Sequence, residues 1–192
     1  MCALEKSDLG VFETKKEEIP SYVLDLALKQ GATDVVVELV EEDERIIRFS
    51  NNEVSVSKAY HEIMLNMFLM IEKHRAATSV PLSSAKNLEK AVLRLVKTAK
   101  ITPPAEVYAP LPKGPFRYNQ KLLKGSRIFL EPNELMDYVE EAIASALGEG
   151  AEKVAGTLVA TRAKATLATS GQVYVTGEQT GLEMSVRAFT SD

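Results

Sequence analysis

The sequence predicts an α+β fold, a mostly antiparallel sheet with about three helices, built from a duplicated helix–β-hairpin unit. The first observation is a repeat: Gly31–Ser57 and Gly150–Thr176 align without a gap, 119 residues apart, with Val35 on Val154. The second is that a helical pattern precedes each copy. The third is the alternation of apolar and polar residues within each copy, which is typical of strands with one buried face.

Three apolar stripes at helical spacing predict the helices. The first helix follows Ile19-Pro20, with Ser21 as its N-cap and Gly31 past its end. The second follows Ser83 or Ser84, either of which can cap it, and the third runs from about Asn133 to Leu147. The stripes comprise Val23, Leu24, Ala27 and Leu28; Leu88, Ala91, Val92, Leu95, Val96 and Ala99; and Leu135, Met136, Val139, Ile143, Ala146 and Leu147.

The strands are expected after the first and the third of these helices. The first begins at Thr33 and is expected to turn at Glu42-Asp43, and Asn51-Asn52 then favours a tight hairpin. The apolar run 63–71 predicts a central strand covered on both faces. Further predicted features, in chain order, are a strand from Arg75 to Val80, a hairpin turn at Ser170-Gly171, and a strand from Leu182 to Phe189.

The domain organisation follows from these elements. Residues 1–18 form a polar N-terminal segment, and residues 19–192 form one domain with repeat units at about 20–80 and 133–190. The connection 100–132 holds six of the eight prolines, so it is neither a central strand nor a helix interior. We expect it to cross the surface on apolar anchors, which are Val107, Tyr108, Phe116, Tyr118, Ile128 and Phe129.

Composition excludes several classes of protein. A net charge of −4 argues against direct nucleic-acid binding, which favours basic surfaces. The single cysteine cannot form an intrachain disulfide, which fits a reducing cytoplasm. No signal-peptide pattern opens the chain, and the most apolar run, 63–71, is too short to span a membrane and is interrupted by Asn66.

His61-Glu62 is the only pair that suggests metal chemistry. Zinc peptidases place two histidines one helical turn apart with a glutamate as base. Here Leu65 and Asn66 stand where the second histidine is needed, and His74 is thirteen residues away. Because zinc needs three or four convergent ligands, we expect no metal site and no catalytic residue in this chain.

The remaining candidates have structural interpretations. Gly148-Glu149-Gly150 follows a helix, so it indicates a C-cap rather than a phosphate loop. Thr169-Ser170-Gly171 lacks the flanking glycine and following helix of a nucleophile elbow. The acidic runs 41–44 and 140–141 are expected on solvated surfaces, where either could bind a cation weakly. The strand arginines could share a face and hold a carboxylate or phosphate, but cross-strand pairing with glutamate is favoured; they are Arg45, Arg48, Arg75, Arg162 and Arg187.

Taken in order, these motifs resemble a known family. Gly31-Ala32-Thr33-Asp34 precedes a strand, RFSNNEV follows at 48–54, RAATS at 75–79 precedes a helix, and a Thr-Ser-Gly turn precedes LEMSVRAF at 182–189. From about residue 20 onward the chain is similar to the N-terminal part of the TldD/PmbA family, also called modulators of DNA gyrase.

The resemblance implies a cytoplasmic protein that pairs with another TldD/PmbA-type subunit, as a homo- or hetero-oligomer, in peptide processing. TldD-type members are zinc peptidases whose motif lies after the region seen here, and PmbA-type members lack it. The resemblance therefore implies zinc only in a TldD-type C-terminal region, and the chain itself is expected to be an N-terminal fragment or isolated domain. We expect a non-catalytic domain that shapes a peptide cavity and a subunit interface, with its substrate-binding residues unknown. The alternative is a free-standing peptide- or protein-binding module with no peptidase link.

Overall fold

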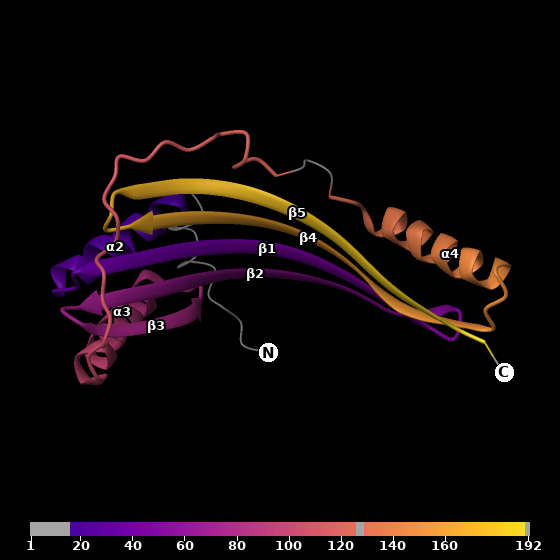
Figure 1. Ribbon diagram of the computed structural model, residues 1–192, viewed down its shortest axis with the longest axis horizontal. Coiled ribbons are helices and arrows are strands. Elements are labelled where there is room, and N and C mark those ends of the chain that lie inside the picture. The colour runs from indigo at the N-terminus through magenta and orange to yellow at the C-terminus, as the bar shows by residue number, and fades with distance from the viewer. Residues whose placement is uncertain (1–15, 126–128, 191–192) are drawn as a thin grey trace. The chain divides into compact units, whose positions relative to one another are not determined.

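The computed structural model describes residues 16–125 and 129–190 and confirms the α+β class (Figure 1). Five strands form one antiparallel sheet in the order β3-β2-β1-β4-β5, accompanied by three α-helices. The elements are η1 (Lys16–Glu18), α2 (Ile19–Lys29), β1 (Asp34–Ser50), β2 (Glu53–Ile71), β3 (His74–Pro81), α3 (Ala85–Ile101), α4 (Pro132–Gly148), β4 (Lys153–Thr169) and β5 (Val173–Phe189). Most of the polar segment 1–18, and the expected anchor Ile128, lie outside the described residues.

The chain divides into two compact units, and the long strands contribute to both. Unit 1 comprises the described residues up to Glu41, together with Ile63–Asn119 and Ala165–Gly177. Unit 2 comprises Glu42–Glu62, Gln120–Lys164 and the described part of Glu178–Asp192. Each unit has its own cluster of buried apolar side chains.

In unit 1, α2 and α3 supply the helical side of the core. The predicted stripe of α3 is confirmed, because five of its six positions are buried and Ala91 packs against them. On α2, Val23 and Ala27 are buried, but Leu28 is 38% exposed, so its placement in the stripe was wrong. Opposite the helices, the buried faces of the strands contribute Val35, Val37, Leu39, Leu65, Met67 and Leu69.

The predicted caps of these two helices need correction. Helix α2 begins at Ile19, so Ser21 lies inside it and is not the N-cap. The reason is Pro20, whose fixed φ suits the first helical turn and allows the helix to start before the serine. Ser84 occupies the N-cap position of α3, but its side chain makes no capping hydrogen bond.

The strands run longer than predicted. β1 continues through Glu42-Asp43, where a turn was expected, because Asp43 is held by His61 of β2 and Arg162 of β4. Asn51 and Asn52 do form the predicted hairpin, with φ of 51° and 69°. The predicted turn at Ser170-Gly171 is confirmed as well, and Gln172 supplies its left-handed residue with φ of 67°.

The apolar run 63–71 is covered on one face and only partly covered on the other. Its odd-numbered residues Leu65, Met67 and Leu69 are buried in the core of unit 1. On the opposite face Met70 is buried, but Met64, Asn66 and Phe68 are only half-buried. A continuous apolar run therefore does not establish two covered faces, because methionine and phenylalanine can also line an open surface.

In unit 2, α4 packs on a second core. Leu135, Val139 and Ile143 of α4 are buried together with Ile47, Phe49, Val154, Leu158 and Ala160 of the strands. The predicted position of the helix is confirmed to within one residue at each end, and Glu131 with Glu134 forms a capping box at its start. Leu147, expected in the stripe, is 38% exposed.

The two sequence repeats share several local features. Gly31 and Gly150 each follow a helix with φ of 91° and 94°, a conformation that favours glycine. Val35 and Val154 are both fully buried. That the two helix–hairpin segments arose by duplication stays a prediction.

The proline-rich connection is irregular in its described part, as expected. In unit 1, Tyr108 donates a hydrogen bond to Asp34, and Asp34 also accepts one from the Leu111 amide at 3.2 Å. Val107 was expected as an anchor but is 89% exposed. Within the described residues, no helix is long and apolar enough to cross a membrane.

Candidate functional site

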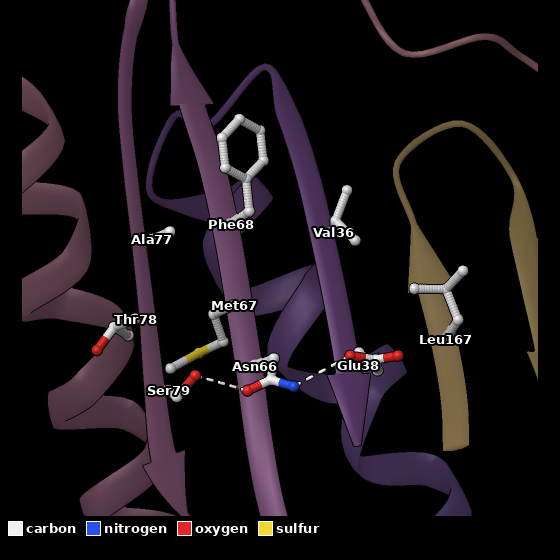
Figure 2. A pocket seen from close by; sticks show the side chains of 9 residues that line it. All are labelled: Val36, Glu38, Asn66, Met67, Phe68, Ala77, Thr78, Ser79 and Leu167. Carbon is white, nitrogen blue, oxygen red and sulfur yellow. Dashed lines mark hydrogen bonds between the residues drawn. The ribbon is translucent and has the colours of Figure 1, made fainter. Parts of the chain in front are cut away.

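Unit 1 has a groove on its sheet, and most of its lining residues, among them Val36, Glu38 and Asn66, alternate along the strands with the buried core residues (Figure 2). It has a volume of about 590 Å³ and crosses four strands, β3, β2, β1 and β4. Its lining residues are Val36, Glu38, Asn66, Met67, Phe68, Ala77, Thr78, Ser79 and Leu167. The volume falls within the range of about 300–1,000 Å³ that small-molecule sites occupy.

A row of polar side chains crosses this groove, as Figure 2 shows. Ser79 Oγ donates to Asn66 Oδ1 at 2.6 Å, and Asn66 Nδ2 donates to Glu38 Oε2 at 3.0 Å. Asn66 and Ser79 are direct cross-strand partners in the β2–β3 ladder. Three neighbouring strands therefore hold one hydroxyl, one amide and one carboxylate in a fixed order.

The chemistry of the groove is that of a binding surface. Glu38 is its only ionisable lining residue, and the other lining side chains are apolar, carry a hydroxyl group or, at Asn66, an amide. No second titratable group stands beside Glu38 to complete an acid–base pair or a nucleophile–base pair among the residues lining it. The groove therefore offers a ligand apolar surface and a few fixed hydrogen-bonding groups.

Unit 2 carries a smaller acidic depression. It has a volume of about 300 Å³ and is lined by Glu42, Glu44, Ile46, Tyr60 and Glu62. The acidic run 41–44 therefore lies on a strand, where alternate residues point to opposite faces, instead of forming a turn. The side chain of Asp43 therefore points to the opposite face of the strand from the side chains of Glu42 and Glu44.

Asp43 is the centre of an ion-pair cluster within unit 2. Its Oδ2 accepts hydrogen bonds from Arg162 Nη2 at 2.8 Å and Nε at 3.2 Å, and its Oδ1 lies 2.9 Å from His61 Nδ1. These partners, Arg162 first and then His61, hold the pKa of Asp43 below its usual range, although its partial burial opposes them. His61 thus has a carboxylate partner on a neighbouring strand, and its side chain is 52% exposed.

Two arginines hold the end of the proline-rich connection in the same unit. The guanidinium carbons of Arg45 and Arg162 lie 4.3 Å and 4.7 Å from the centre of the Phe129 ring. Arg45 also forms an ion pair of 3.3 Å with Glu131 and donates a hydrogen bond to the Leu130 carbonyl. Phe129 is therefore confirmed as an anchor. Arg45 does pair with a glutamate, but Glu131 belongs to the connection, so this ion pair is not the cross-strand pairing that was predicted.

The other candidates from the sequence have structural partners. Ser170 accepts a hydrogen bond on Oγ from the Val35 amide at 3.0 Å, which ties the β4–β5 turn to β1. His74 Nδ1 lies 2.6 Å from the Thr102 carbonyl oxygen. Gly150 follows α4 at a positive φ, as the C-cap interpretation requires. Across residues 16–125 and 129–190, no three His, Cys, Asp or Glu side chains are grouped to hold a metal ion.

Sequence reasoning missed the residues that line the groove of unit 1. Asn66 was noted only as an interruption of an apolar run and as a mismatch in a histidine motif. Its significance was nevertheless visible, because a lone amide amid apolar residues on a strand must find a hydrogen-bond partner. The partners come from segments 28 residues earlier and 13 residues later in the chain, so only the fold identifies them.

The comparisons with known proteins agree at the level of the fold. No protein-family model matches the sequence, and no curated protein matches it. A protein from Bacteroides thetaiotaomicron described as a modulator of DNA gyrase is 16% identical, with a TM-score of 0.75 over 91% of this chain and 41% of its own. TldE from Thermococcus kodakarensis is 17% identical, with a TM-score of 0.66 over 85% of this chain and 37% of its own.

A third structure, described as a modulator of a DNA gyrase from Thermotoga maritima, is 15% identical with a TM-score of 0.68. It covers 88% of this chain and 39% of its own length. The chain thus spans about two fifths of the length of the structures it matches. The resemblance to the TldD/PmbA family stated from the sequence is confirmed for the fold.

Proposed function

We propose that this chain is a non-catalytic domain of a TldD/PmbA-type protein linked to peptide processing, which shapes a peptide cavity and a subunit interface. The observation that carries the proposal is the shared fold over 91% of the chain with a TM-score of 0.75. The matched proteins are more than twice as long as this chain, and in our proposal the reaction is carried by a part of the protein other than these residues. The cellular setting we propose is the cytoplasm, with no direct contact to nucleic acid.

The groove of unit 1 supports the peptide-cavity part of this proposal. It lies on an open sheet face and combines apolar walls with a central row of hydrogen-bonding groups. Apolar pockets that alternate with a few placed polar groups suit an extended peptide, whose side chains also alternate.

The edge strand β5 supports the subunit-interface part. The turn sets Thr169 opposite Val173, and Thr166 and Thr176 share a hydrogen bond of 3.0 Å across the two strands. Further along β5, the alternating residues Leu182, Met184 and Val186 share one face of the strand. These three side chains are 53%, 36% and 41% exposed, so an apolar edge is available for another TldD/PmbA-type subunit or a second copy of the chain.

A zinc analysis tests the non-catalytic assignment. We expect no stoichiometric zinc to remain on the purified chain after dialysis, because His61 pairs with Asp43 and, among the described residues, no third ligand converges on them. One tightly held zinc per chain that is lost in His61→Ala would contradict the assignment.

A free-standing peptide- or protein-binding module is the second candidate. It is favoured by the groove itself, because residues of unit 1 alone line it. The reading frame beyond residue 192 separates the two candidates: a continuation with His-Glu-x-x-x-His indicates the TldD type, and one without it the PmbA type. A stop codon directly after that residue favours the module.

Peptide binding can be mapped directly. We expect backbone amide signals from β1, β2 and β3 around Glu38, Asn66 and Ser79 to shift when short extended peptides are added to the ¹⁵N-labelled chain. Amides of α4 in unit 2 serve as the internal control and should not move. Uniform small shifts, or none, would remove the support that the groove gives to the proposal.

A further inference from the structure

We propose that the groove of unit 1 binds a lysine or arginine side chain of an extended peptide, with Glu38 as the carboxylate that recognises the cation. The inference rests on the proposed peptide-binding function and specifies its substrate class. The occupant is argued from the charge and shape of the groove.

Glu38 has capacity for a cation. Its Oε2 accepts one hydrogen bond, from Asn66 Nδ2 at 3.0 Å. In the described ranges 16–125 and 129–190 no lysine, arginine or histidine forms an ion pair with it, and no donor contacts Oε1. A carboxylate has about four lone-pair sites, so most of its accepting capacity remains.

The surroundings of Glu38 hold the carboxylate in one orientation. Ser79 Oγ donates to Asn66 Oδ1 at 2.6 Å, which obliges the amide to present its NH₂ group toward Glu38. The three residues come from β3, β2 and β1, paired strands whose backbone positions are set by the sheet. A recognition group on a rigid element loses little entropy when a ligand arrives.

The rest of the groove fits the aliphatic stem of a basic side chain. Val36, Phe68 and Leu167 are half-buried and line the same groove as Glu38. Lysine and arginine pack their methylene groups along apolar surface while the charged end reaches a polar partner. A bare metal ion fits less well, because it requires several oxygen ligands and Glu38 is the only carboxylate in the lining.

The test uses three blocked pentapeptides that differ only at the central residue: lysine, norleucine or glutamate. Norleucine keeps the stem of lysine without the ammonium group. Binding to the 192-residue chain is measured by fluorescence anisotropy at low salt. We expect the lysine peptide to bind about tenfold more tightly than the norleucine peptide, because one charge-assisted hydrogen bond changes the dissociation constant by about this factor. The glutamate peptide should bind most weakly.

Two variants assign the preference to the groove. Glu38→Gln keeps the shape and an acceptor for Asn66, so it should bind the norleucine peptide normally and lose the tenfold preference for lysine. Ser79→Ala frees the Asn66 amide to rotate and should reduce the preference in part. Glu53→Gln, which removes an exposed carboxylate at the start of β2, is the matched control and should keep the full preference.

The outcomes separate this proposal from the one on which it rests. Equal binding of lysine and norleucine peptides by the unsubstituted chain would overturn the proposed cation recognition while peptide binding stands. A preference that persists in Glu38→Gln would also overturn it. No binding of any peptide would overturn both proposals.

Discussion

Gly156→Ala perturbs the most crowded glycine in the core of unit 2. A β-carbon at this position would lie 2.1 Å from the Ser185 carbonyl oxygen on β5 and 2.4 Å from Cζ of Phe49. Phe49 is 2% exposed and belongs to the buried cluster that includes residues of α4, so its ring has little space into which to move. The Ser185 oxygen is backbone, and relieving that contact means shifting a strand.

The expected cost follows from these two contacts. Overpacking a filled core costs about 1–3 kcal/mol, and a clash with both a backbone atom and a buried ring belongs at the upper end, about 3 kcal/mol. For a chain of this length that corresponds to a melting temperature lowered by roughly 6–12 °C. The matched control is Gly148→Ala, because a β-carbon added there would have no atom within 4 Å and alanine favours a helix.

The assay is urea unfolding followed by circular dichroism and by intrinsic tyrosine fluorescence. Coincident transitions are needed before one free energy of unfolding is assigned, because the chain has two compact units. Gly148→Ala should be neutral or slightly stabilising. A Gly156→Ala variant within about 0.5 kcal/mol of the parent, the usual spread of surface substitutions, would refute the packing of Phe49 against β4 and β5.

Three further predictions concern other contacts. Asp34→Ala removes the buried acceptor that holds the proline-rich connection and should cost about 1–3 kcal/mol, with faster proteolysis within 102–119. Arg162 keeps the pKa of Asp43 low in the folded chain, so this pair stabilises the fold above the unfolded carboxyl pKa of about 3.9. Its contribution is lost as the pH falls below that value. In melting experiments at several pH values, Asp43→Asn should therefore weaken the loss of stability on the acidic side. The chain should self-associate through β5, most simply as a twofold dimer, and Val186→Lys should lower the mass measured by light scattering; a monomer at every concentration would contradict this.

Helices and hairpin turns were predictable because their signals are local. The stripe of α3 occupies one face at a 3.6-residue period, and Asn51-Asn52 carries its own turn preference. Strand lengths were not predictable in the same way. The acidic residues around Asp43 suggested a turn, but their partners on β2 and β4 stabilise an unbroken strand, and those partners are distant in sequence.

The candidate site was less predictable than the fold. The histidine, serine and glycine motifs suggested functional roles, but in the structure their residues form part of an ion pair, a hairpin turn or a helix end. The groove depends on Glu38, Asn66 and Ser79, whose types are common on any strand. These three side chains are brought together by the pairing of β1, β2 and β3, a tertiary feature that no single segment encodes.

The most direct test of the central claim is a time course of peptide integrity in the presence of the chain. The purified protein is incubated with the lysine pentapeptide and added zinc, and mass spectrometry follows the peptide while anisotropy reports binding. The account predicts that the peptide is bound and remains intact over hours. Hydrolysis that is abolished by a chelator would contradict it, because a metal-dependent peptidase centre would then lie within these residues.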